Sequence, residues 1–150
     1  MKIKKTKPVA TTEPSRILVP VDFSESSLDA LQHALAFARQ NDARLTLLHV
    51  IEPFHASLFI DTTGTQHAMR EASHLRLTKL WEATRKAWPR TGHELREGDP
   101  VTTITALAKR MNADLIVMGT QGRTGLQRGL IGSVAERVVR HAPCPVLVVR

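Results

Sequence analysis

Short apolar runs alternate with amphipathic helical segments along almost the whole chain, and this alternation restricts its fold more than any other feature. Apolar runs predict strands over residues 16–22, 44–51, 114–119 and 146–149, with a weaker strand over 92–97. Apolar residues spaced three and four apart predict helices over residues 27–40, 66–88, 101–112 and 133–140. Runs that are apolar on both faces are typical of parallel sheets, whose connections are helical and right-handed. The sequence therefore predicts an α/β fold, a single-domain open doubly wound parallel five-stranded sheet with helices on both faces.

Three segments of this pattern are less regular than the others. The strand over 92–97 is the least apolar, so we expect it at an edge of the sheet. Residues 54–63 mix apolar residues with a turn signal, and two interpretations stay open: a mobile cover over a neighbouring site, or a loop packed on the domain edge. The helix over 66–88 is expected to carry its apolar stripe at Met69, Leu75 or Ala72, Leu80 and Ala83.

Length and composition indicate one domain. The chain has 150 residues, 42% of them hydrophobic and 23% charged, which is enough apolar material for one core. It contains no run of 18 apolar residues, so we expect no membrane-spanning helix. Residues 1–15 are basic and lack the apolar stretch of a secretory signal, so we expect a flexible basic tail before a domain over 16–150. The single cysteine, Cys144, excludes an internal disulfide, and the expected location is cytoplasmic.

The net charge of +7 is concentrated in two parts of the chain. The tail has four lysines against Glu13, and residues 119–150 have five arginines against Glu136. Such basic patches attract nucleic acid or phosphate-bearing ligands. The chain has no zinc-finger spacing, no tyrosine and only 4% aromatic residues, which argues against nucleic acid. We therefore expect no nucleic-acid partner and no membrane partner.

The expected ligand site lies where the strand order of the sheet reverses. In open α/β sheets, ligands bind beyond the carboxyl ends of the strands at such a point. If the order is 3-2-1-4-5, the reversal falls between the strands over 16–22 and 114–119. The candidate residues are those at which the sequence departs from an apolar strand: Pro20, Val21, Asp22, Met118 and Gly119.

A glycine-rich stretch over residues 119–132 holds five of the eight glycines and leads into a predicted helix at Ser133. Glycine permits close approach of the backbone to a ligand, and the first N–H groups of a helix attract anions. Arg123 and Arg128 add positive charge nearby. The stretch contains neither GxxxxGK[ST] nor GxGxxG, and a long surface turn is the alternative interpretation. The favoured interpretation is a site for a di- or triphosphate.

Two polar residues at the strand ends invite a catalytic interpretation. Asp22 could act as an acid, but no partner base or metal ligand accompanies it, so we favour binding of a ribose or a metal. His49 lies inside a buried strand, and we interpret it as a core residue rather than a ligand. The seven histidines are scattered without zinc-ligand spacing. We therefore expect no catalytic residue and no protein metal site.

The spacing Gly119-x2-Gly122-x9-Gly132-Ser133 resembles the G-2x-G-9x-G-[ST] motif of nucleotide-binding universal stress proteins. Residues 17–24 and 47–50 look like the first and second strands of that family. Residues 113–119 and 142–149 resemble its C-terminal signature. The resemblance covers residues 16–150. It implies a Rossmann-like, adenine nucleotide α-hydrolase-like fold with strand order 3-2-1-4-5.

The resemblance also implies a function and a set of site residues. It implies an ATP-binding sensor or regulator in the stress response, not an enzyme, with at most slow hydrolysis, with Mg²⁺ bound with the nucleotide and with an unknown regulatory protein partner. It further implies a homodimer paired through the last strand, at Val146 and Val148. The implied ATP-binding residues are Pro20, Val21, Asp22, Val50 and Met118 around adenine and ribose, Gly119, Gln121, Gly122 and Arg123 along the turn, and Gly132, Ser133, Val134 and Ala135 at the phosphates.

Two other functions stay open at this stage. The first is an enzyme of the adenine nucleotide α-hydrolase-like group that cleaves ATP to activate a substrate. Such enzymes usually have a serine- and glycine-rich loop after the first strand, and residues 22–25 contain no glycine. The second is a nucleotide-free interaction module that uses the last strand.

Gln121 stands where relatives often carry His or Arg, so the phosphate affinity of this chain would differ from theirs.

Overall fold

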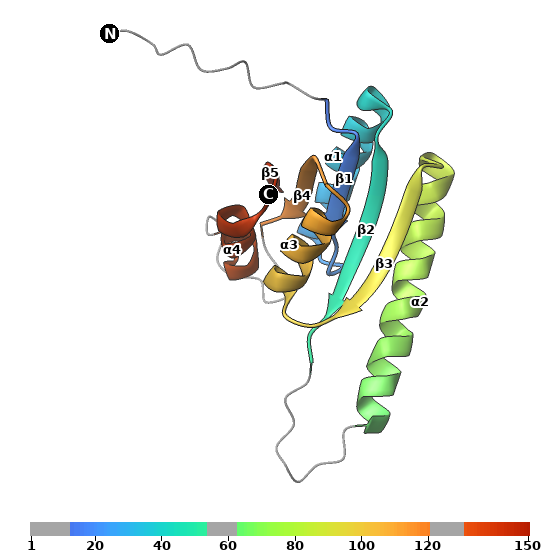
Figure 1. Ribbon diagram of the computed structural model, residues 1–150. Helices are drawn as coiled ribbons and strands as arrows, with labels where there is room; N and C mark the ends of the chain where they lie inside the picture. The colour runs from blue at the N-terminus through green and yellow to red at the C-terminus, as the bar shows by residue number, and fades with distance from the viewer. Residues whose placement is uncertain (1–12, 54–62, 121–130) are drawn as a thin grey trace, which may run out of the picture.

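A computed structural model describes residues 13–53, 63–120 and 131–150. Its five strands form one parallel sheet with the order β3-β2-β1-β4-β5 (Figure 1). The strands are β1 (Arg16–Pro20), β2 (Arg44–Ile51), β3 (Thr91–Glu97), β4 (Leu115–Gly119) and β5 (Val146–Val149). The helices are α1 (Glu25–Asn41), α2 (Thr63–Ala87), α3 (Pro100–Arg110) and α4 (Ser133–His141). The predicted α/β class and strand order are confirmed.

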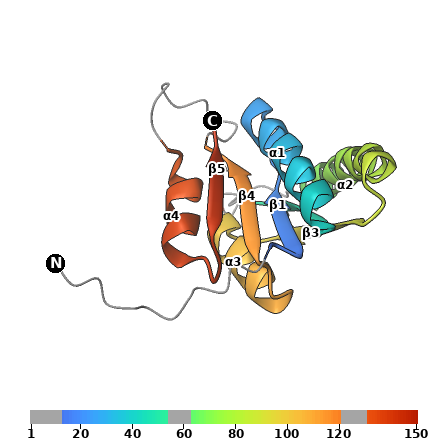
Figure 2. The ribbon, with the colours of Figure 1, turned by 90° about the horizontal axis from the view of Figure 1, so that it is seen from above.

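Helices cover both faces of the sheet, as Figure 2 shows from above. α1 and α2 lie on one face, and α3 and α4 lie on the other. Each face of the sheet has its own hydrophobic core, and the central strand β1 contributes side chains to both. Ile17 and Val19 pack under α1, Leu18 packs under α3 and α4, and all three side chains are fully buried. The uninterrupted apolar run in this strand therefore reflects burial on two faces.

The two edges of the sheet are β3 and β5. β3 pairs with β2 over its whole length, and its predicted position at an edge is confirmed. The carbonyl of Pro145, just before β5, accepts a hydrogen bond from the Ile116 N–H of β4, and the carbonyl of Val149, at the end of β5, accepts one from the Thr120 N–H just after β4. Backbone groups alternate in direction along a strand, so those of Val146 and Val148 point toward the free edge.

α2 buries a different face from the one that its sequence predicts. Leu77 is 1% exposed, and Trp81 and Trp88 pack against the same core. The indole nitrogens of the two tryptophans donate hydrogen bonds to the carbonyls of Thr91 and Ala43, each at 2.8 Å. These large side chains decide which face of the helix meets the sheet. The predicted stripe is therefore wrong except at Leu80, because Met69, Ala72, Leu75 and Ala83 are exposed.

The start of the described domain is held by hydrogen bonds to Asp114. Ser15, assigned to the tail from the sequence, donates its N–H and its hydroxyl to one carboxylate oxygen of Asp114, at 3.0 and 2.7 Å. These bonds connect the start of β1 to the turn before β4. Residues 1–12 of the expected tail and residues 54–62 of the expected loop lie outside the described residues. None of the helices in the described part of the chain is long and apolar enough to cross a membrane.

Candidate functional site

A cavity of about 400 Å³ opens at the carboxyl ends of β1, β2 and β4, where the strand order reverses. It is the place at which the topology of an open α/β sheet predicts a ligand. Three of the expected site residues, Gln121, Gly122 and Arg123, lie outside the described residues. The structure brings the other ten together around the cavity: Pro20, Val21, Asp22, Val50, Met118, Gly119, Gly132, Ser133, Val134 and Ala135.

The cavity has further walls that the sequence did not indicate. Leu48, His49 and Ile51 come from the end of β2, and Glu52 directly follows it. Their place in the wall is expected from the parallel sheet, because neighbouring parallel strands end at the same edge. Met69 and Ser73 come from α2, whose first turns extend past the strand ends (Figure 1), and no local pattern marks them. The residues missed by the sequence analysis are Ser27, Leu48, His49, Ile51, Glu52, Met69, Ser73, Pro100, Ile104 and Thr120.

Asp22 lies in a tight turn between β1 and α1. Its Oδ1 accepts hydrogen bonds from the backbone N–H of Ser24, at 3.0 Å, and from the Ser24 hydroxyl. Burial raises the pKa of Asp22, but the hydrogen bonds from Ser24 more than offset it and leave the pKa below its ordinary value. Asp22 is therefore a carboxylate at neutral pH and offers negative charge to hydroxyl donors in the cavity.

The turn at Asp22 is held by aromatic and cationic neighbours. Phe23 has a φ of 65°, a left-handed conformation that a bulky side chain seldom adopts. The centroid of its ring lies 4.6 Å from the centroid of the His49 ring. The guanidinium carbon of Arg76 lies 4.2 Å from the same Phe23 centroid. His49 is 4% exposed, and its Nδ1–H donates to the Val21 carbonyl at 2.7 Å. The prediction that His49 is buried is confirmed, although it also lines the cavity.

The N-terminus of α4 faces the cavity without a side-chain cap. Gly132 is the N-cap residue and, among the described residues, no side-chain capping hydrogen bond is made; the first intrahelical bond runs from Glu136 N–H to the Gly132 carbonyl. The N–H groups of residues 133–135 thus have no partner within the helix. In contrast, Ser24 caps α1 and Asp99 caps α3. The Gly132 N–H donates to the Thr120 carbonyl at 2.6 Å, which connects this end of α4 to the end of β4.

Gly119 is required by helix packing as well as by any ligand. A Cβ built on this residue would lie 2.6 Å from the Oγ of Ser26, 2.7 Å from its carbonyl carbon and 2.8 Å from its carbonyl oxygen. Carbon atoms do not approach this closely in folded proteins. The absence of a side chain at Gly119 therefore lets the first turn of α1 lie directly against the end of β4.

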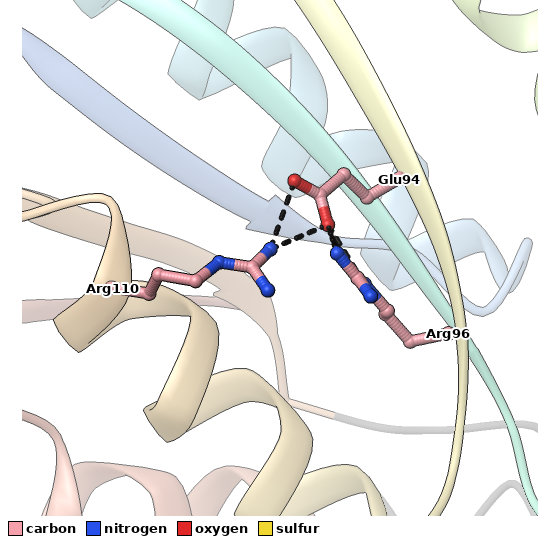
Figure 3. Close-up of polar contacts among 3 residues, drawn as sticks. All are labelled: Glu94, Arg96 and Arg110. Atoms are coloured by element: carbon pink, nitrogen blue, oxygen red, sulfur yellow. Dashed lines mark hydrogen bonds and ion pairs between the residues drawn. The ribbon is translucent and has the colours of Figure 1, made fainter.

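An ion cluster connects β3 to the C-terminal end of α3 (Figure 3), and none of its three residues lines the cavity. Glu94 accepts hydrogen bonds from Arg96 Nε at 2.8 Å and from Arg110 at 2.9 and 3.1 Å. Both arginines are about half exposed, so the cluster contributes little to stability. Its two guanidinium groups already share a carboxylate, and we do not assign them to the site.

The chemistry of the cavity favours binding. Apolar side chains such as Val50 and Met118 line it. Asp22 adds an ionised carboxylate to the lining, and the N-terminus of α4 faces the cavity with N–H groups that the helix does not use. Such a site suits a ligand with an apolar ring, hydroxyl groups and an anionic group. Among the described residues, no three His, Cys, Asp or Glu side chains are grouped so that they could hold a metal ion.

Comparisons with known proteins agree with the fold. The model of the universal stress protein family matches residues 14–150. Universal stress protein MJ0531 from Methanocaldococcus jannaschii is 38% identical over 141 residues, which cover 90% of this chain and 81% of that protein.

Solved structures show the same architecture. The universal stress protein UspA from Lactobacillus plantarum is 32% identical, with a TM-score of 0.79, and the match covers 91% of this chain and 97% of that chain. A universal stress protein crystallised in complex with cAMP is 24% identical, with a TM-score of 0.67 and coverage of 92% and 98%, and it shares the fold. On the family match over nearly the whole length and on these relatives, the chain belongs to the universal stress protein family.

Proposed function

We propose that the cavity binds ATP together with Mg²⁺. The observation on which this rests is the N-terminus of α4, which has no side-chain cap among the described residues and presents N–H groups that the helix does not use to a cavity lined also by the ionised Asp22. Phosphate groups would bind at residues 132–135, where the helix dipole adds a favourable potential. The two features suit the opposite ends of one nucleotide, because an anion fits the helix end and hydroxyl groups fit a carboxylate.

The rest of the nucleotide would fit the remaining walls. Val50 and Met118 are apolar and line the cavity, as an adenine ring requires. The ribose hydroxyls would donate to Asp22. Mg²⁺ would arrive with the phosphates, and we assign no residue of the chain to it. The turn over residues 121–123 is expected to line the phosphate side, as the family resemblance implies.

We further propose that the protein is a sensor or regulator in the stress response and not an enzyme. Catalysis needs a group placed to accept a proton, and Asp22, a carboxylate in the cavity lining, is already held in hydrogen bonds from Ser24. In the competing interpretation, an ATP-cleaving enzyme, Asp22 would be catalytic. The Asp22→Asn variant distinguishes the two. We expect this variant to lose ATP affinity. Unchanged affinity with an ATPase rate about a hundredfold lower, which corresponds to a rise of roughly 2.7 kcal/mol in the activation free energy, would indicate that Asp22 is catalytic.

Assembly and location follow from the same proposal. A homodimer would form through β5, whose Val146 and Val148 direct backbone groups toward a free edge. The nucleotide state of the cavity would be recognised by an unknown regulatory protein in the cytoplasm. A nucleotide-free interaction module would form the same dimer with an empty cavity, so the ligand decides between these interpretations.

Two measurements test the nucleotide site. Native mass spectrometry of the purified protein would identify a bound nucleotide by its mass. Calorimetry with ATP and Mg²⁺, and with cAMP as a second nucleotide, would then compare the unmodified chain with Gly132→Val. Gly132 has φ −62° and ψ 150°, which valine adopts readily, so this variant should fold and yet obstruct the helix end.

The controls for this test are matched. Gly92→Val also adds a branched side chain, but nothing lies within 4 Å of a Cβ at that position. Ser133→Ala should weaken ATP binding by about 0.5–1.5 kcal/mol, the value of one hydrogen bond. Unchanged ATP affinity in Gly132→Val would refute the proposed site.

A further inference from the structure

The bulky residue Phe23 holds a backbone conformation that normally requires glycine. Its φ of 65° lies in the left-handed region, and such strain persists only where the surroundings enforce it. The residue before it, Asp22, is the carboxylate of the proposed site, and the residue after it, Ser24, donates to that carboxylate. Whatever holds Phe23 in this conformation therefore also holds the carboxylate toward the cavity.

Phe23 packs against the core under α1 and α2, and two side chains from different parts of the fold also contact its ring. His49 of β2 lies 4.6 Å away, and its imidazole is fastened by the hydrogen bond to the Val21 carbonyl. Arg76 of α2 places its guanidinium 4.2 Å from the ring centroid, within the range of a cation–π interaction. α2 itself is connected to the end of β3 by an ion pair between Arg70 and Glu97 at 3.1 Å.

We propose that Arg76 is a positioning residue for the nucleotide site, which acts through the ring of Phe23 to keep the Asp22 turn in its binding conformation. Arg76 is not among the residues that line the cavity. Ser73, one helical turn earlier, does line it, so α2 contacts both the cavity and the turn. This inference rests on the proposed binding of ATP and adds to it a residue that the glycine motif does not contain.

The test is a double-mutant cycle between Arg76 and Phe23, read as ATP affinity by calorimetry with Mg²⁺. Arg76→Ala should weaken binding about threefold to tenfold, the range expected for loss of one cation–π contact. Arg76 is exposed on a helix that tolerates alanine, so the variant should fold. In the Phe23→Gly background, where glycine adopts the left-handed conformation without strain, Arg76→Ala should change affinity by less than about twofold.

Further variants separate positioning from charge and from general stability. Phe23→Ala keeps the strain without the ring and should bind more weakly than Phe23→Gly. Arg76→Lys keeps a cation for the ring and should restore part of the affinity. Arg85→Ala is the matched control, because Arg85 makes the same type of contact, 5.2 Å from the Trp81 ring, away from the cavity.

The outcomes are distinct. If the unmodified chain binds ATP and Arg76→Ala binds equally well, or loses the same affinity in the Phe23→Gly background, the inference is overturned, because Arg76 then does nothing or acts by charge. If the unmodified chain binds no nucleotide, the proposed function fails, and hydrogen exchange of the Ser24 amide decides the rest. This amide donates to Asp22, so it should exchange faster in Arg76→Ala than in Arg85→Ala. Equal exchange rates would overturn the positioning role.

Discussion

Replacing Gly119 by alanine should destabilise the protein through the backbone of α1. The added Cβ would meet three atoms of Ser26 at 2.6–2.8 Å, and two of them are the carbonyl carbon and oxygen. A hydroxyl can rotate away, but backbone atoms move only with the helix. α1 is fixed by fully buried residues such as Ala30 and Ala34, so its first turn cannot retreat without disturbing the core.

The cost can be estimated from overpacking in other cores. Inserting a methyl group into a well-packed site costs about 1–3 kcal/mol. For a chain of this length, 1 kcal/mol lowers the Tm by about 2–4 °C, so Gly119→Ala should melt about 2–12 °C below the unmodified protein. Adding Ser26→Ala should recover only part of the loss, because it removes the Oγ contact and leaves the two backbone contacts in place.

Thermal unfolding followed by circular dichroism measures this loss, and urea denaturation gives the free energy of unfolding. Gly92→Ala is the control, because nothing lies within 4 Å of a Cβ there, and it should leave the Tm nearly unchanged or slightly raised. A Tm for Gly119→Ala equal to that of Gly92→Ala would refute the argument. Complete recovery by Ser26→Ala would show that the backbone contacts do not matter.

Three more predictions concern pH, the face of α2 and assembly. The pKa of Asp22 is lowered in the folded state, so its carboxylate stabilises the fold above the ordinary pKa of 3.8, and this effect is lost as pH falls through the lowered value. The free energies of unfolding of Asp22→Asn and of the unmodified chain, measured in urea, should therefore converge in acid. Convergence at high pH instead would contradict the sign. Leu77→Ala should lower the free energy of unfolding by about 2–5 kcal/mol, whereas Leu75→Ala, at a site 55% exposed, should change it by less than about 0.5 kcal/mol; equal losses in urea denaturation would restore the face predicted from sequence. Val148→Pro removes an N–H that faces the free edge, so light scattering should find a dimer for the unmodified chain and a folded monomer for the variant; an unaltered dimer would exclude β5 as the interface.

The candidate site was largely predictable because it lies at strand ends. Pro20 and Met118 lie at the ends of apolar runs whose length and alternation with helices predict parallel strands, and parallel strands end at one edge. The reversal between β1 and β4 then brings these ends together. Ser73 could not be predicted in this way, because its place depends on how far α2 extends past the sheet.

The sequence by itself determined the order of strands and helices, the burial of β1 on both faces and the edge of the sheet at which the cavity lies. These properties follow from local periodicity and from the few topologies that parallel strands permit. Only the tertiary structure decided which face of α2 is buried, why Gly119 cannot carry a side chain and what holds the Asp22 turn. Each of these depends on contacts between residues distant in the chain: Trp88 with Ala43, Gly119 with Ser26, and Arg76 with Phe23. A pattern of neighbouring residues does not contain such contacts, because they arise only when whole elements pack in three dimensions.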